Sequence, residues 1–192
     1  VAMQESVINL TRNSYMGQAM RGKPLPRSGN GQRRDTVPSD LFPCKPGGPK
    51  DYVFITISRA AIKHWNALLK VMGREDLVGD ARYATGSGRV EHADEIIKMV
   101  SDWCRSRTKS EVMEAINRAG APAGALFDMS DLSNDPYLRK RGTFVTIEHP
   151  VRGAVTMLGW PVKMSGSHVP VRSAPLLGAH TKEVLSEWLA PR

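Results

Sequence analysis

The sequence predicts an α+β protein, and the order of its strand and helix patterns supports this class. Short runs rich in Phe, Val, Ile and Tyr occur as neighbouring pairs over residues 41–57 and 143–158, which is typical of antiparallel hairpins. Between these pairs the apolar residues change to helical spacing, which predicts a group of three or four helices. Strand pairs that are segregated from grouped helices favour an α+β fold over alternating βαβ units.

The composition is that of a globular protein, since 41% of the 192 residues are hydrophobic and 24% are charged. The formal net charge of +8 permits an anionic partner. However, the basic residues form only short clusters without interleaved aromatic residues, so we expect no nucleic-acid partner. Cys44 and Cys104 lack metal-ligand spacing, which predicts a reducing compartment and no metal site. Because neither a membrane span nor a signal peptide is visible, we expect a cytoplasmic protein without membrane attachment.

The first twenty residues predict a helix with Val7, Leu10 and Met16 at inward positions. No cap and no initiator Met precede this helix, and we therefore expect the chain to be part of something longer. Residues 21–40 contain three Pro and three Gly among charged residues. This composition predicts a linker or long loop, the kind of segment that often carries functional residues.

A hairpin followed by a helix is predicted next. The strand-like runs Leu41 to Lys45 and Tyr52 to Ile57 are separated by Pro and Gly residues that favour a turn. Pro43 indicates that the first strand lies at a sheet edge. Ser58 is the expected cap of a helix whose apolar residues include Trp65 and which ends before a glycine.

The segment Thr85 to Arg89, with the sequence TGSGR, allows two interpretations. Glycines ahead of a helix can form an anion-binding nest, but the segment lacks the known phosphate-binding patterns and no strong strand precedes it. A plain turn is therefore the favoured interpretation. In the helix that follows, Ile96, Val100 and Cys104 share one face, so Cys104 is expected to be a small core residue and not a reactive thiol.

Two further helix starts carry capping signals. Thr108 and Glu111 match the capping box, in a helix that ends at Gly120. Asp135 followed by Pro136 predicts another turn of helix, with Asp as the cap and Pro at the first helical position.

Residues 143–148 and 154–158 predict a second hairpin, which an extended, Pro-containing arm connects to a last helix. The apolar residues of this helix fall on one face: Val184, Leu185, Trp188 and Leu189. Because so short a helix is marginal without packing, we expect this face to dock onto a body formed elsewhere.

The residue pattern alone identifies no catalytic group. The five histidines show no HExxH spacing, and the sequence has no GxSxG motif. A catalytic carboxylate depends on its pocket, which the sequence does not display. The chemistry therefore stays unassigned at this level.

Several motifs, taken together and in order, resemble the second half of the class III CoA-transferases, a family that includes the formyl-CoA transferase type. The matching stretches are RSGNG at 27–31, GAPAG at 120–124, HPVRG at 149–153, GWP at 159–161 and APLLGAHTKEVL at 174–185. The last pattern is the most specific, and the similarity extends over nearly the whole chain.

The resemblance implies a division of the chain between two domains. Residues 41–142 would form a small α/β domain with short antiparallel strands and grouped helices. Residues 1–20 and 143–192 would be segments of an incomplete Rossmann-like large domain, and residues 21–40 the linker that carries an active-site loop. Because family chains interlock in pairs, the implied partner is a second copy or a missing N-terminal half.

The resemblance also implies the reaction, in which coenzyme A moves from an acyl-CoA to a small carboxylic acid, as in a formyl-CoA:oxalate-like transferase. An Asp carboxylate would attack the thioester to form a mixed anhydride. No residue of this chain matches that Asp, so no catalytic residue is assigned here. Coenzyme A is expected as a substrate whose main binding residues lie outside the chain, and no metal is expected.

The substrate-binding residues implied by the resemblance form a glycine-rich loop that covers the reacting acyl group: Gly29, Asn30, Gly31, Gln32 and Arg33. Arg33 and Arg34 stand where the formyl-CoA transferase type continues with glycines. Either arginine can pair with the carboxylate of an acid substrate, and the alternative is a solvated charge of the linker.

A second hypothesis is a catalytically inactive, stand-alone binding or dimerisation module of the same fold. Under either hypothesis we expect the chain alone to be inactive.

Overall fold

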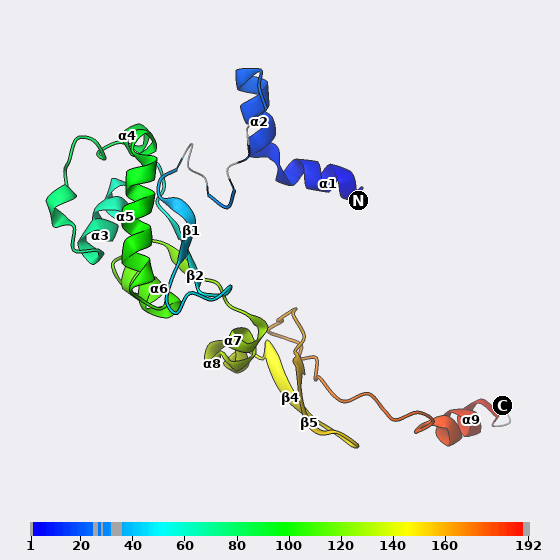
Figure 1. The fold of residues 1–192 in the computed structure, drawn as a ribbon. Helices are drawn as coiled ribbons and strands as arrows, with labels where there is room; N and C mark the ends of the chain where they lie inside the picture. The colour runs from blue at the N-terminus through cyan, green and yellow to red at the C-terminus, as the bar shows by residue number, and fades with distance from the viewer. Residues whose placement is uncertain (1, 25–26, 28, 32–35, 190–192) are drawn as a thin grey trace. The chain divides into compact units, whose positions relative to one another are not determined.

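The computed structural model describes residues 2–24, 27, 29–31 and 36–189 of the chain. The chain forms two compact units, Val1–Leu126 and Phe127–Arg192. Helices and short antiparallel strands occur in both units (Figure 1), which confirms the predicted α+β class. Within the described ranges, no helix is long and apolar enough to cross a membrane.

The first unit begins with two helices, α1 (Met3–Leu10) and α2 (Arg12–Arg21). They meet at Thr11, whose backbone departs from helical geometry and whose hydroxyl donates to the Ile8 carbonyl at 2.8 Å. The predicted helix over the first twenty residues is thus present but divided. The inward positions predicted for this helix are wrong for this chain, because the side chains concerned are exposed: Val7, Leu10 and Met16.

A three-stranded antiparallel sheet forms the centre of the first unit. Strand β2 (Tyr52–Thr56) lies between β1 (Ser39–Pro43) and β3 (Ala123–Ala125). The β1–β2 pair confirms the predicted hairpin, and Pro43 lies on an edge strand as expected. Strand β3 was not predicted, because three small residues carry no strand pattern and become a strand by pairing with β2.

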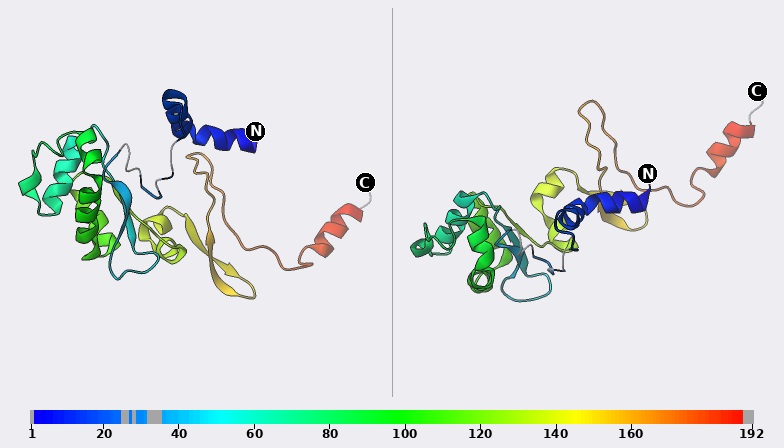
Figure 2. Two further views of the ribbon diagram at one scale, coloured as in Figure 1. Left: turned by 45° about the horizontal axis from the view of Figure 1, so that its top comes forward. Right: turned by 90° about the horizontal axis from the view of Figure 1, so that it is seen from above.

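Helices cover this sheet (Figure 1; Figure 2). They are α3 (Ile62–Val71), the short 3-10 helix η1 (Glu75–Leu77), α4 (Gly86–Glu91), α5 (Ala93–Arg105) and α6 (Lys109–Arg118). Helix α5 packs on β1, and α6 packs on β2 and β3.

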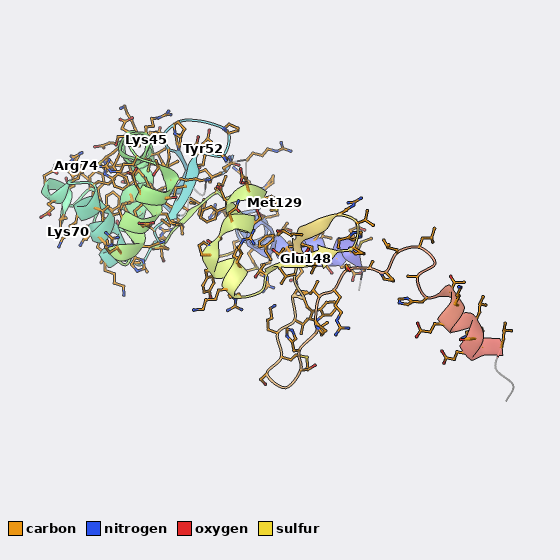
Figure 3. All side chains as sticks on the ribbon, turned by 90° about the horizontal axis from the view of Figure 1, so that it is seen from below. Lys45, Tyr52, Lys70, Arg74, Met129 and Glu148 are labelled. Atoms are coloured by element: carbon orange, nitrogen blue, oxygen red, sulfur yellow. The ribbon has the colours of Figure 1, made fainter. Side chains whose placement is uncertain are left out.

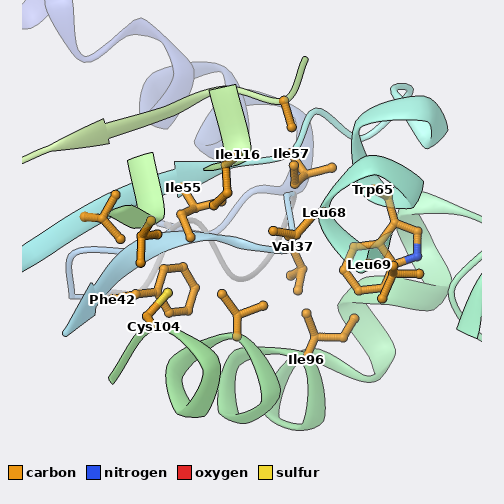
Figure 4. Close-up of a cluster of buried hydrophobic side chains, with 14 of the residues drawn as sticks. Val37, Phe42, Ile55, Ile57, Trp65, Leu68, Leu69, Ile96, Cys104 and Ile116 are labelled. Atoms are coloured by element: carbon orange, nitrogen blue, oxygen red, sulfur yellow. The ribbon is translucent and has the colours of Figure 1, made fainter. Parts of the chain in front are cut away.

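The core of the first unit lies between the sheet and these helices. Phe42 and Ile55 from the strands meet Leu68 of α3 and Ile96 of α5 (Figure 4). Cys104 is fully buried beside them, which confirms its predicted core role. Charged side chains such as Lys70 extend from the surface of this unit (Figure 3).

The helix ends test the capping predictions. The capping box of Thr108 and Glu111 is present in full. The cap predicted at Ser58 is wrong, since α3 begins after Ala61 and the Ser58 carbonyl instead accepts from the Ala61 amide in a preceding turn. The plain turn predicted at 85–89 is also wrong, because this segment starts α4 with Thr85 as its N-cap.

The second unit contains the helices α7 (Met129–Asn134), α8 (Pro136–Lys140) and α9 (Thr181–Leu189) and the strands β4 (Phe144–His149) and β5 (Gly153–Leu158). Strands β4 and β5 form the predicted hairpin. Asp135 caps α8 by accepting from the Leu138 amide at 2.8 Å, as predicted. The apolar residues of α9 are exposed.

Candidate functional site

The glycine-rich loop leads from α2 toward β1, and the structure describes three of its five predicted substrate-binding residues. Gly29, Asn30 and Gly31 are described, whereas Gln32 and Arg33 lie outside the described residues. Gly29 has a φ of +68°, in the left-handed region that favours glycine. The chain therefore turns at Gly29 and Asn30.

Gly31 brings the loop backbone against the carboxylate of Asp40 in β1. Gly31 is buried, and a Cβ atom at this position would lie 2.5 Å from Asp40 Oδ2. The Asp40 side chain is itself held, because its Oδ1 accepts from the Leu41 amide at 2.8 Å. A larger residue would therefore have to displace a fixed carboxylate, which explains why this position holds glycine.

Arg89 of α4 is a site residue that the sequence reasoning missed. Its side chain is 1% exposed. Nε donates to the Val37 carbonyl at 3.1 Å, and Nη1 donates to the Tyr83 carbonyl at 3.1 Å. Nη2 donates to the carbonyls of Arg59 at 3.1 Å and Ser58 at 3.4 Å. One guanidinium thus joins three backbone segments through four carbonyls, and one of these segments, at Val37, directly precedes β1.

The environment of Arg89 is built to hold a charge without a carboxylate. All four acceptors are backbone carbonyls, and the Trp65 ring centroid lies 5.9 Å from Arg89 Cζ. Burial lowers the pKa of the guanidinium from its ordinary value, although arginine stays protonated in proteins. Hydrogen bonds from a charged donor contribute about 1.5–3 kcal/mol each, which offsets the cost of removing the charge from water.

A second polar group lies next to Arg89. The Tyr83 hydroxyl donates to Glu95 Oε1 at 2.6 Å. Burial, followed by this hydrogen bond, raises the pKa of Tyr83 to about 12. His92 stacks edge-on against Tyr83 with a centroid separation of 5.6 Å. These contacts hold Tyr83 against the start of α5.

Two kinds of side-chain arrangement bear on the chemistry of the described residues: nucleophile–base pairs and metal-binding clusters. In the hydrogen bonds of these residues, no Ser, Thr or Cys side chain is paired with a histidine as a nucleophile would be with its base. Burial raises the pKa of both the Cys44 and the Cys104 thiol, which makes them poor nucleophiles. In the same part of the chain, no cluster of three His, Cys, Asp or Glu side chains is arranged to hold a metal ion.

The second unit has a cavity of about 520 Å³ beside β4 and the segment that follows β5. Its lining includes Lys140, Arg141 and Lys163. Lys163 Nζ donates to the Gly142 carbonyl at 3.2 Å. These basic side chains give the cavity a positive charge that suits an anionic group.

Comparison with known proteins identifies the family. Residues 1–181 match CoA-transferase family III. The chain belongs to this family. A formyl-CoA:oxalate CoA-transferase of Rhodopseudomonas palustris (strain BisA53) is 33% identical over 207 residues, covering 98% of this chain and 48% of the relative. The Streptomyces coelicolor protein of the same name is 32% identical over 197 residues, covering 96% and 47%.

The chain spans about half the length of the curated relatives that it matches. Among solved structures, a CAIB/BAIF family protein from Brucella suis has a TM-score of 0.70 at 22% identity, over 93% of this chain and 44% of its own. The Rv3272 protein of Mycobacterium tuberculosis has a TM-score of 0.63 at 22% identity, over 95% and 46%. These two likenesses support the fold of this CoA-transferase family III chain.

The structure therefore brings together residues that the motifs did not connect. Gly31 lies on Asp40, and Val37 is held by Arg89. A sequence signal for Arg89 exists in the two glycines that precede it within a helix start, but this signal indicates close packing only once the neighbouring backbone is known.

Proposed function

We propose that this chain is the C-terminal portion of an acyl-CoA:carboxylate CoA-transferase of the formyl-CoA:oxalate type. The family match and the names of the curated relatives support this assignment. The observation that carries the proposal for the site is the close approach of Gly31 to Asp40, since it places the described part of a glycine-rich loop against the sheet of the first unit.

In the proposed reaction, an Asp carboxylate outside this chain attacks the thioester carbonyl of the acyl-CoA. The carbon–sulfur bond breaks, coenzyme A leaves as the thiolate, and a mixed anhydride forms. The thiolate then attacks the aspartyl carbonyl of this anhydride, which releases the donor acid as its carboxylate and leaves an aspartyl-CoA thioester. The acceptor carboxylate displaces the thiolate from that thioester to form a second mixed anhydride. The thiolate attacks the acceptor's carbonyl in this anhydride, which gives the new acyl-CoA and restores the Asp carboxylate. Thiolate and carboxylate exchange, so the net reaction needs neither an oxidant nor a metal.

We propose that the loop over Gly29 to Arg33 covers the acyl group during this exchange. Glycines allow the backbone to approach the acyl group closely, and a covered anhydride is protected from water. Arg33 is proposed to bind the carboxylate of the acid substrate, because a guanidinium can donate two parallel hydrogen bonds to it.

We also propose how the chain is completed. Residues 1–20 and 143–192 would belong to the large domain, residues 41–142 to the small domain, and residues 21–40 to the loop segment between them. The missing contacts would come from an N-terminal half, with a second copy completing a homodimer in the cytoplasm. The exposed apolar residues Met3, Leu177 and Trp188 support a partner that covers them.

A complementation assay tests the proposal. The chain would be assayed with formyl-CoA and oxalate, alone and mixed with the half of the Rhodopseudomonas palustris relative that it does not match. We expect no transfer by the chain alone and oxalyl-CoA formation by the mixture, measured by mass spectrometry of the CoA thioesters. A silent mixture, under conditions in which the intact relative is active, would contradict the proposal.

The exposed apolar faces also favour a second candidate, an inactive binding or dimerisation module. Leu177 and Trp188 are 106% and 82% exposed, respectively, and such side chains stabilise an interface once they are covered. Sedimentation velocity and binding of a hydrophobic dye test this candidate. A monodisperse monomer that binds little dye would exclude it.

A further inference from the structure

The TGSGR segment at Thr85 to Arg89 has no place in the proposed reaction, yet its structure is specific. Thr85 caps α4 by accepting from the Gly88 amide at 3.0 Å. Helix α4 has six residues, and this amide is already used by its cap. The segment is therefore not an anion-binding nest, and its glycines need another explanation.

Both glycines are required by the space around them. A Cβ atom at Gly86 would lie 2.1 Å from Arg59 Cγ and 3.0 Å from the Arg59 carbonyl oxygen. A Cβ atom at Gly88 would lie 2.3 Å from the Arg82 carbonyl oxygen. The first turn of α4 can therefore lie directly against two other stretches of backbone only because these positions lack side chains.

Because of this close packing, the Arg89 side chain lies beside the backbone that precedes β1. Its guanidinium lies within hydrogen-bond distance of the Val37 carbonyl, and Val37 is itself 1% exposed. The next residue, Pro38, accepts from the Ile57 amide at 2.8 Å. The backbone that leaves the glycine-rich loop is thus tied both to α4 and to the residue after β2.

Two described positions in the segment before β1 lie against other parts of the first unit. Gly31 lies against Asp40, and Val37 is bound by Arg89. Both contacts lie at the start of β1. The position of the backbone at Val37 therefore depends on the packing of α4, although α4 lies about fifty residues later in the sequence.

We propose that Arg89 is a positioning residue, which fixes the backbone at Val37, between the glycine-rich loop and β1, and so supports the loop in its proposed place over the acyl group. Gly86 and Gly88 contribute to this role because they lack side chains. They allow α4 to pack closely enough for Arg89 to reach the Val37 carbonyl. The inference rests on the proposed function of the loop, but the anchor itself can be tested without any substrate.

Hydrogen exchange of the whole chain, measured by mass spectrometry, tests the anchor. Arg89→Lys keeps the charge but cannot reach four carbonyls with a single ammonium. We expect amides over 36–42 to exchange about tenfold faster in this variant, while amides of α6 change less than about twofold. Arg74→Lys is the matched control, because Arg74 pairs with Asp76 at the surface.

A second variant covers the case in which Arg89→Lys fails to fold. Gly88→Ala keeps Arg89 but places a methyl group against the Arg82 carbonyl, so it should give the same local pattern of exchange. Equal acceleration over 36–42 and over α6 in either variant would mean general destabilisation, and it would overturn the anchor. Unchanged exchange over 36–42 would overturn it as well.

The link to catalysis is tested by measuring how acyl-CoA divides between transfer and hydrolysis. The measurement uses the mixture of the chain with the unmatched half of the relative, in which CoA transfer is expected. When the loop is loosened, water attacks the mixed anhydride, which releases the free acid and restores the Asp carboxylate. We expect Arg89→Lys to lower the ratio of acyl-CoA transferred to acyl-CoA hydrolysed by about threefold to tenfold, and Arg74→Lys to leave it unchanged. Faster exchange with an unchanged ratio would overturn the positioning role. Absence of transfer in the unmodified protein would instead overturn the proposed function, and the exchange data would still decide the anchor.

Discussion

The two units of the chain differ in how far their side chains are buried. In the first unit, the strands and the helices α3 to α6 contribute to one buried cluster. In the second unit, none of the described residues is buried. Yet both units contain capped helices and an antiparallel hairpin. Local signals are therefore sufficient to form the elements, whereas a core requires faces that meet.

The largest effect should come from removing a buried ring in the first unit. Trp65 is 1% exposed and Trp188 in α9 is 82% exposed. We expect Trp65→Ala to lower the free energy of unfolding by about 3–5 kcal/mol and Trp188→Ala to change it by less than about 0.5 kcal/mol. Urea unfolding followed by circular dichroism measures both. Equal losses of unfolding free energy in the two variants would contradict the difference in side-chain burial between the two units.

The next effect concerns the loop contact. Gly31→Ala places a Cβ atom against the buried Asp40 carboxylate, and we expect a loss of about 1–3 kcal/mol from overpacking. Gly166→Ala in the second unit is the matched control, because no atom lies within 4 Å of the added Cβ. The same unfolding assay applies. A neutral Gly31→Ala would show that Asp40 moves aside freely.

A smaller effect is expected at the helix caps. Thr108→Ala removes a full capping box from α6, and we expect it to destabilise the first unit by about 1 kcal/mol. Asp135→Ala removes the cap of α8 in the second unit and should leave the unfolding midpoint of the first unit unchanged. Hydrogen exchange resolved by segment separates the two responses. A shift of α6 exchange by Asp135→Ala would mean that the units are coupled.

The smallest effect at neutral pH is expected for Tyr83→Phe, about 0.5–1 kcal/mol for one hydrogen bond. The effect of this hydrogen bond can be recognised by the pH dependence of the free energy of unfolding. The pKa of Tyr83 in the folded protein is raised from 10.0 to about 12, so its contribution is complete below the unfolded value and decreases as the pH rises toward the folded one. As the pH rises from 10.0 to about 12, the free energy of unfolding should therefore decrease less in Tyr83→Phe than in the unmodified protein. Tyr137→Phe, at an exposed site in the second unit, should not.

Much of the fold could be predicted because its signals are local. The hairpin at β1 and β2, the capping box of α6 and the Cys104 face of α5 follow from side-chain period and cap chemistry. Strand β3 could not be predicted, because its pairing with β2 depends on where α6 places it.

The site was less accessible to prediction. The RSGNG motif identified Gly29 and Gly31 through the family resemblance, and their backbone geometry agrees with a need for glycine. The two glycines before Arg89 did not suffice to predict its burial, because arginine is usually exposed and its four carbonyl partners converge only in three dimensions. The substrate-binding role stays a prediction for all five residues of the loop: Gly29, Asn30, Gly31, Gln32 and Arg33.

The hydrogen bond from Arg89 to the Val37 carbonyl joins residues 52 positions apart. Contacts of such separation form late, because the intervening chain must first lose its conformational entropy. The hairpin and the helices α5 and α6 can form earlier from nearer contacts. We therefore expect the backbone at Val37, which precedes β1, to take its final position only after α4 has docked.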